Sequence, residues 1–282
     1  MLYLLGAVLS SALVTIVMKA SKPYTRSDAS VLAANYMCCL ALSFAYSGGG
    51  TLFSAAGGTR FAMLLGLVAG VFYVGTYKLL QWNILHNGAV LSAAFMKLGV
   101  LVPSLLAVLW FGERPRVPQI AGLVLAVAAI LLLHSEKSAD ATEKRSGTKW
   151  MLVVLLLSGG VCDGLSKVYE VYGDPALESD FLLYLFAVAF LLCTATCLVK
   201  RERPGRRDLA AGVCIGVPNY FSTRFLLLSL SRIPAVVAYP TYSVSAILVV
   251  LFAGLAFFRE RLSRRQWGAI GVILAALVLL NL

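Results

Sequence analysis

Ten long apolar runs constrain the fold of this chain more than any other feature. Each is close to the roughly 20 residues that a helix needs to cross the hydrocarbon core of a bilayer. None shows the alternation of apolar and polar residues that is typical of a membrane-spanning strand. The runs therefore predict an all-α polytopic membrane protein with ten transmembrane helices, at about 2–20, 30–47, 61–85, 89–111, 117–134, 150–172, 180–200, 208–230, 234–258 and 265–282.

The composition supports this class of protein. Of the 282 residues, 60% are hydrophobic and only 13% are charged, and the mean hydropathy is +0.86. A net charge of +11 on a soluble protein would suggest a nucleic-acid partner. Most of the Lys and Arg residues here lie in short loops between apolar runs, where they set membrane orientation. We therefore expect a lipid bilayer and a small molecule as partners, and no nucleic acid.

The six cysteines all lie inside apolar runs, without C-x-x-C spacing and without a histidine nearby. This pattern is typical of small apolar residues in helix packing. We expect no metal site, no disulfide framework and no cofactor.

A polar segment at 135–149 divides the ten spans five and five. It mixes charged residues with Ser, Ala, Thr and Gly, as flexible linkers do. The predicted organisation is a first five-helix repeat at 1–134, a cytoplasmic linker at 135–149 and a second five-helix repeat at 150–282.

The two halves are weakly similar at an offset of about 146–148 residues. The clearest match aligns GERPRVPQIAGLVLAVAAILLL, which begins at Gly112, with RERLSRRQWGAIGVILAALVLL, which begins at Arg259. Further pairs are Gly66 with Gly212, Gly70 with Gly216, Lys78 with Arg224, Ser10 with Ser158 and Lys19 with Lys167. An odd number of spans in each copy predicts that the second copy is inverted in the membrane. Inverted repeats are typical of secondary transporters.

Loop charges predict the orientation of the spans. Loops 20–29, 86–88, 135–149, 200–207 and 259–265 share one side and carry 15 Lys or Arg residues, against four on the other side. The positive-inside rule makes the first side cytoplasmic and places both termini outside.

The two hinges that contain Glu113 and Glu260 carry a resemblance to a known family. Phe111-Gly112-Glu113 is followed by Gln119 and Gly122, Arg259-Glu260 is followed by Gln266 and Gly268, and Pro103 precedes the first hinge. This doubled signature resembles the ten-span branch of the drug/metabolite transporter superfamily, although Arg259 replaces the glycine of the first copy.

The resemblance implies a cavity lined mainly by spans one, three, four, six, eight and nine. Known members of this superfamily carry substrates that range from amino acids and sugars to nucleotide sugars, phosphorylated sugars and choline. We interpret Glu113 and Glu260 as capping or ion-pair residues at helix ends, and not as substrate ligands.

Five basic residues lie inside the spans, where a charge is costly and usually functional. They are Lys19, Lys78, Lys97, Lys167 and Arg224, and the acid inside the spans is Asp163. Lys19 is near a span end and can extend to the headgroups instead. Asp163 and Lys167 are four residues apart, so an internal salt bridge is an alternative to substrate contact. Lys78, Lys97 and Arg224 have no acid within a helical turn, and Lys97 has Val244 opposite it in the repeat.

Aromatic and amide residues near these charges are further candidates for the substrate site. Tyr73 and Tyr77 lie one turn apart in span three, and Asn219 and Tyr220 lie in the matching region of span eight. Tyr239 precedes Pro240, which frees a backbone carbonyl in span nine. Packing of these tyrosines is the alternative interpretation.

The excess of basic residues predicts a secondary transporter that moves a small organic anion, phosphorylated or carboxylated, by alternating access in a bacterial inner membrane. An exporter of amino acids or other neutral metabolites, and a flippase of an anionic lipid head group, remain alternatives. An enzyme is not expected, because Asp163 stands alone in the spans and no HExxH or GxSxG motif occurs.

Overall fold

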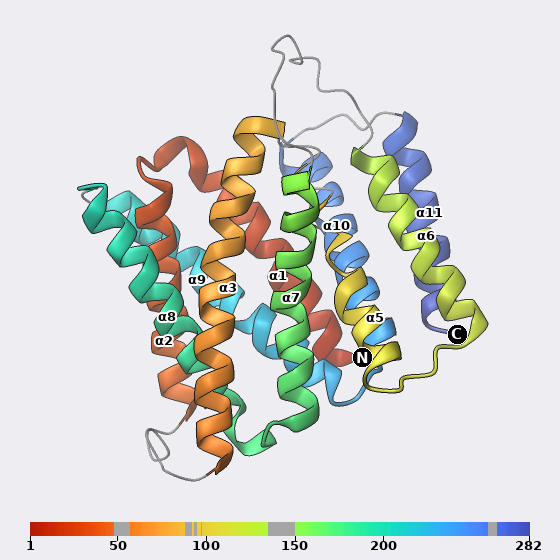
Figure 1. The fold of residues 1–282 in the computed structure, drawn as a ribbon. Helices are drawn as coiled ribbons and strands as arrows, with labels where there is room; N and C mark the ends of the chain where they lie inside the picture. The colour runs from red at the N-terminus through yellow and green to blue at the C-terminus, as the bar shows by residue number, and fades with distance from the viewer. Residues whose placement is uncertain are drawn as a thin grey trace. The chain divides into compact units, whose positions relative to one another are not determined.

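The computed structural model describes residues 1–47, 57–87, 92, 95, 96, 98–134, 150–202, 204–258 and 264–282. Over these residues it contains α-helices and short 3-10 turns, and no strand. Its helices are α1 (Leu2–Ser21), α2 (Asp28–Ser47), α3 (Gly57–Asn87), α5 (Leu101–Leu109), α6 (Val117–His134), α7 (Trp150–Tyr172), α8 (Glu178–Val199), α9 (Arg206–Leu230), α10 (Ala235–Phe258) and α11 (Arg264–Leu280). Figure 1 shows these elements, and they confirm the predicted all-α fold.

The observed helices follow the predicted spans closely. Helices α6 and α7 begin and end at the predicted residues. Seven helices of the described regions are long and apolar enough to cross a membrane, while α6 and α11 contain shorter apolar stretches, Val117–Leu132 and Trp267–Leu280. The predicted fourth span is represented by α5, and residues 88–91, 93, 94 and 97 of that region lie outside the described residues.

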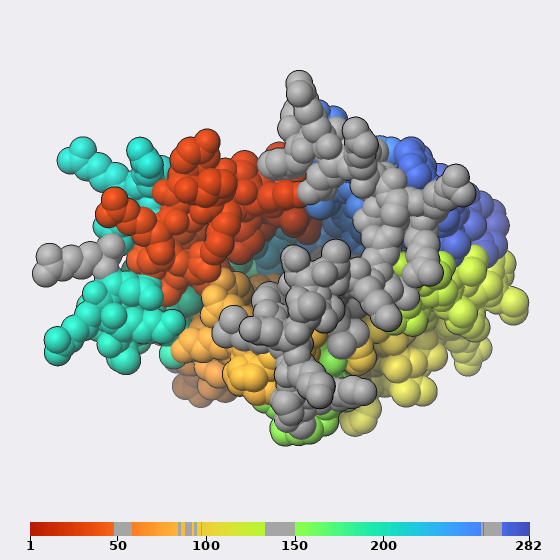
Figure 2. Space-filling model, turned by 90° about the horizontal axis from the view of Figure 1, so that it is seen from above, coloured from red at the N-terminus to blue at the C-terminus, as the bar shows by residue number. Residues whose placement is uncertain are grey.

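The chain forms two compact units. The first contains Met1–Val74 and Val168–Ser229, and the second contains Gly75–Lys167 and Leu230–Leu282. Each unit therefore takes helices from both halves of the sequence. Helix α2 packs on α8 in the first unit, and α6 packs on α11 in the second, as Figures 1 and 2 both show.

A glycine seam joins α3 to α8 in the first unit. Gly66 faces Phe181, Tyr184 and Leu185, and Gly70 faces Leu185 and Val188. A Cβ atom at Gly70 would lie 2.6 Å from the carbonyl oxygen of Leu185. Small residues four apart allow this close approach, which lets membrane helices gain van der Waals contact.

A second glycine seam, equivalent to the first, joins α9 to α2. Gly212 faces Val31, Ala34 and Asn35, and a Cβ atom at Gly212 would lie only 2.4 Å from the Cβ of Ala34. Gly216 faces Asn35 and Cys38 in the same way. The glycine pairs that align in the sequence repeat therefore play equivalent packing roles, each against a helix of the other repeat.

Contacts at the helix ends show that equivalent helices run in opposite directions. In the first unit, the backbone N–H of Arg26 donates to Asp208, and Ser27 donates to Glu202. These bonds join the loop after α1 to the loop before α9, which were predicted to share one side. In the second unit, Gly122 near the start of α6 contacts Leu280 at the end of α11. The equivalent helices α6 and α11 therefore run in opposite directions, as the predicted inversion of the repeat requires.

The signature after Glu113 has a local structural explanation. The side-chain oxygen of Gln119 accepts a hydrogen bond of 2.9 Å from the backbone N–H of Arg116, so it caps the start of α6. Gly122 leaves room for Leu280, since a Cβ atom there would lie 2.9 Å from its Cγ. Behind them, Ala126, Ala129 and Ile130 pack into a buried cluster with residues of α10 and α11.

Candidate functional site

Arg224 is the best-defined interior cation of the first unit. It is partly buried in α9, six residues before the helix ends. Its guanidinium carbon lies 4.0 Å from the centre of the Tyr46 ring, and its Nη1 donates a hydrogen bond of 3.0 Å to the hydroxyl of Tyr220. The two tyrosine rings stack on each other at 5.8 Å. Tyrosine faces stabilise a guanidinium without neutralising its charge.

The packing of α2 against α9 explains why Tyr46 reaches Arg224. The two helices run parallel along the second glycine seam, where Ala34 faces Gly212. Tyr46 lies twelve residues after Ala34, and Arg224 lies twelve residues after Gly212. The seam therefore fixes the register that brings the ring under the guanidinium.

Glu178, the first residue of α8, is the carboxylate whose charge interacts with Arg224. No ion pair within 4.0 Å joins any described carboxylate to Arg224. Glu178 Oε1 is itself buried and has no hydrogen-bond partner among the described residues. Among the described residues, Arg224 is thus held by the Tyr46 ring and the Tyr220 hydroxyl, with no carboxylate within ion-pair distance.

Asn219 lies one residue before Tyr220 and joins α9 to α2. Its Nδ2 donates to the Oδ1 of Asn35 at 3.2 Å, and the Sγ of Cys39 lies 3.8 Å from the same nitrogen. Cys39 in turn donates to the carbonyl oxygen of Gly216. This buried polar junction supports the helix surface that carries Arg224.

The other candidate residues of the first unit differ in how exposed they are. Lys19 is exposed in the last turn of α1, which is the position expected for a lysine that extends to the headgroups. Tyr73 is partly buried in α3. Tyr220, by contrast, is fully buried, at 0% exposure.

In the second unit, Lys167 forms a buried ion pair with Glu113. Its Nζ lies 3.0 Å from Oε1 of Glu113, and the two side chains are 7% and 16% exposed. The glutamate oxygens also accept hydrogen bonds from the backbone N–H groups of Ala235 and Val236, at 3.0 and 3.1 Å. Glu113 therefore caps the start of α10 and holds α7 to it, which confirms its interpretation as a capping and ion-pair residue.

A second bond joins α10 to α7 one turn further along. The hydroxyl of Tyr239, which is 1% exposed, donates to the backbone carbonyl of Asp163 at 2.6 Å. The side chain of Asp163 is partly buried. This bond anchors α10 to α7, and the part of Tyr239 in a substrate site stays a prediction.

Two of the remaining candidates, Tyr77 and Lys78, lie in the last part of α3. Lys78 is exposed, and Tyr77 is partly buried and accepts a hydrogen bond of 3.0 Å from Gln81. Lys97 and Glu260 lie outside the described residues. The aligned pair Lys78 and Arg224 therefore differs in burial, with only the arginine enclosed by aromatic rings.

Sequence reasoning missed Tyr46 and Glu178 beside Arg224, and it missed Glu113 as the partner of Lys167. The pairing of Glu113 with Lys167 joins residues 54 positions apart, beyond the reach of any helical spacing rule. A search of the described residues for three His, Cys, Asp or Glu side chains that could hold a metal ion finds no such group.

The long apolar helices of the described regions, with a charged and aromatic cluster inside them, are those of a polytopic membrane protein. Residues 146–282 match the model of the EamA-like transporter family. Over this part of the chain the match agrees with the predicted resemblance to the drug/metabolite transporter superfamily.

Two individual proteins are also similar to the chain. An uncharacterized protein of Haemophilus influenzae (strain ATCC 51907 / DSM 11121 / KW20 / Rd) is 22% identical over 210 residues, covering 73% of this chain and 70% of that protein. A protein of known crystal structure is 15% identical and has a TM-score of 0.73, covering 99% of this chain and 94% of the other. At that identity the likeness shows the fold alone.

Proposed function

We propose that this EamA-type transporter moves a small organic anion, carboxylated or phosphorylated, by alternating access. Arg224 carries the proposal. Its guanidinium is partly buried and contacts two tyrosines, and no described carboxylate lies within ion-pair distance. The planar fork of an arginine suits a carboxylate or phosphate, and a partly dehydrated site strengthens the attraction.

The exporter of neutral or zwitterionic metabolites is the second candidate. It requires that the interior basic residues be compensated, and the pairing of Lys167 with Glu113 meets that requirement for one of them. Among the described interior cations away from the span ends, Arg224 in the first unit and Lys78 in the second have no ion pair within 4.0 Å and would serve an anion. A flippase of an anionic lipid head group would use the same charges.

Replacing Arg224 with glutamine is expected to weaken anion binding about 10- to 100-fold, since a hydrogen bond to a charged group contributes about 1.5–3 kcal/mol. Arg224→Lys should recover part of the loss, because it restores the charge without the fork. Tyr220→Phe, which removes only the hydroxyl bonded to Nη1, should have a smaller effect. The measurement is thermal stabilisation of purified protein by a panel of carboxylates, phosphate esters and neutral amino acids, followed by uptake into liposomes.

Arg60→Gln is the matched control, because Arg60 is an exposed arginine at the start of α3. The anion proposal fails if neutral amino acids stabilise the protein while anions do not, or if Arg224→Gln responds to anions as Arg60→Gln does. Uptake of a water-soluble anion into liposomes that contain only this protein separates transport of solutes from flipping of lipids.

Exchange or facilitated transport fits this site better than proton coupling through Asp163, the carboxylate singled out in the spans. Asp163 lies one helical turn before Lys167, a spacing that allows the two side chains to pair. Anion uptake that depends on an anion inside the liposome and not on a pH gradient is the expected result. Uptake driven by a pH gradient alone would contradict it.

The proposed orientation places both termini outside a bacterial inner membrane. It is supported by the basic loops after α1 and before α9, which contact each other through Arg26 and Asp208 and therefore lie on one side. An alkaline phosphatase fused after Leu282 is expected to be active, since that enzyme requires the oxidising outer compartment. A fusion protein that is made at normal abundance but is inactive would show that the orientation is opposite to the proposed one.

A further inference from the structure

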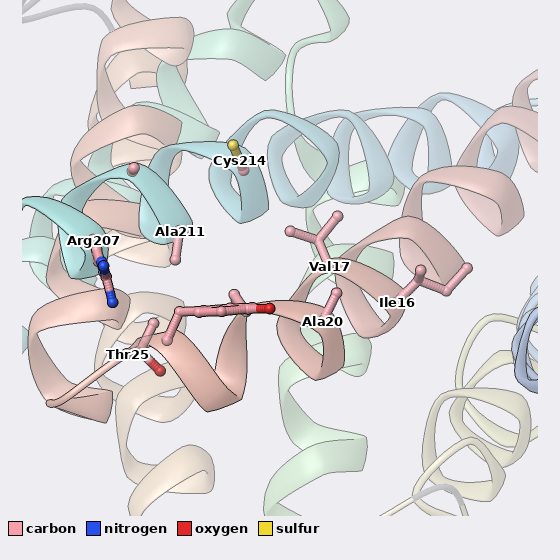
Figure 3. A pocket seen from close by; sticks show the side chains of 10 residues that line it. Ile16, Val17, Ala20, Thr25, Arg207, Ala211 and Cys214 are labelled. Carbon is pink, nitrogen blue, oxygen red and sulfur yellow. The ribbon is translucent and has the colours of Figure 1, made fainter. Parts of the chain in front are cut away.

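A groove opens between α1 and α9 in the first unit (Figure 3), and Arg224 is not part of its lining. It encloses about 570 Å³, within the range of roughly 300–1,000 Å³ typical of small-molecule sites. Its lining comes from the last turns of α1, the segment after it and the first turns of α9: Ile16, Val17, Ala20, Ser21, Tyr24, Thr25, Arg207, Ala210, Ala211 and Cys214.

The groove is polar at one end and apolar along the rest of its length. Figure 3 shows Arg207 extending from α9 toward Thr25, with Val17, Ala20 and Ala211 farther along. The polar end coincides with the end of α1 and the start of α9, where the chain leaves the membrane. The eight residues from Arg207 to Cys214 span about 10 Å of helix, against about 15 Å for one leaflet of the hydrocarbon core. The groove therefore runs from the interface well into one leaflet.

The acids near the polar end have other partners, so Arg207 is not paired with any of them. Asp28 pairs with Lys22 at 2.5 Å, Asp208 accepts the backbone N–H groups of Arg26 and Gly205, and Glu202 accepts from Ser27. Arg207 is exposed and has no hydrogen-bond or ion-pair partner within the part of the chain that the structure describes. Tyr24 is 64% exposed beside it and offers a second donor.

We propose that this groove binds a phospholipid with an anionic head group. One acyl chain lies along the apolar wall, and the phosphate contacts Arg207 and Tyr24. A tyrosine and a basic residue at the level of the head groups are the usual anchors of this interface. The site is separate from the proposed anion site at Arg224 and does not depend on the transported substrate.

Selectivity should come from the head group, because acyl chains contact other lipids as favourably as they contact apolar side chains. Each basic residue near a membrane surface contributes about 1 kcal/mol to anionic-lipid binding, which corresponds to about fivefold in affinity. We therefore expect wild-type protein to retain phosphatidylglycerol several-fold more strongly than phosphatidylcholine with the same acyl chains, by native mass spectrometry and by thermal stabilisation in detergent.

Two variants test the polar end and the apolar wall of the groove separately. Arg207→Gln should weaken phosphatidylglycerol binding about fivefold and phosphatidylcholine binding less, because the choline cation already compensates the phosphate of the latter; Arg60→Gln is its matched control. Ala210→Phe should fill the groove and weaken both lipids, with Ala256→Phe, at an exposed alanine of α10, as its control.

The proposal is overturned if Arg207→Gln keeps the wild-type preference, or if wild-type protein does not distinguish the two lipids. Glycerol phosphate that displaces phosphatidylglycerol at equal concentration would instead identify a site for a water-soluble phosphate. If the wild-type protein is a dimer and Ala210→Phe dissociates it, a second copy of the chain covers the groove instead of a lipid.

Discussion

Replacing Glu113 with alanine is expected to lower the free energy of unfolding by about 3–5 kcal/mol, the range observed when one partner of a buried ion pair is removed. The variant takes the carboxylate partner from Lys167, whose side chain is only 7% exposed. It also removes the acceptor for the N–H groups of Ala235 and Val236 at the start of α10. Both losses occur where water does not replace the missing oxygens.

Arg114→Ala is the control for this variant, because Arg114 is the exposed neighbour of Glu113. The two proteins should be compared by chemical unfolding in the same detergent, and equal stability would show that the ion pair contributes nothing. A double-mutant cycle isolates the pair. Combining Glu113→Gln with Lys167→Met should cost less than the sum of the single changes, since residues in one ion pair are coupled by about 0.5–3 kcal/mol.

The Glu113 contacts also explain how a short hinge organises the second unit. Glu113 follows Gly112, which has a φ of 68° in the left-handed region that glycine adopts without strain. This conformation turns the chain between α5 and α6, and the carboxylate of the next residue reaches α7 and α10. One residue therefore links the loop to two other helices.

Gly212→Ala is expected to destabilise the first unit by about 1–3 kcal/mol, the usual cost of overpacking. The new methyl group would lie 2.4 Å from the Cβ of Ala34 and 2.6 Å from the carbonyl oxygen of Val31. These are backbone and near-backbone atoms, so relief requires α9 to move away from α2. The displacement would also shift Arg224 relative to Tyr46, and anion binding should weaken together with stability.

Gly70→Ala tests the equivalent seam between α3 and α8 and should have a similar cost. Gly75→Ala is the matched control on α3, because a Cβ atom there meets nothing within 4 Å. That variant should be neutral or more stable by up to about 1 kcal/mol, since alanine favours a helix over glycine. If Gly70→Ala and Gly212→Ala unfold like Gly75→Ala, the seams do not determine the packing of the first unit.

The membrane class, the helices and the repeat could all be predicted from the sequence. Span length depends on bilayer thickness and on local hydrophobicity, which are properties of contiguous residues. For this reason α6 and α7 begin and end at the predicted positions. The Gly66 and Gly212 matches indicated equivalent packing, and the structure shows that each glycine serves the same role against the opposite repeat.

The partners of the interior charges were decided only by the tertiary structure. Spacing rules find partners within one helical turn, so they offered Asp163 as a partner for Lys167, and they could not find Glu113, which reaches Lys167 at 3.0 Å from a distant loop. Tyr46 reaches Arg224 because glycine seams fix how far α2 slides along α9. Hydrophobicity determines that these helices lie in the membrane, but the close fit of small and large side chains determines their register, and register decides which charges meet.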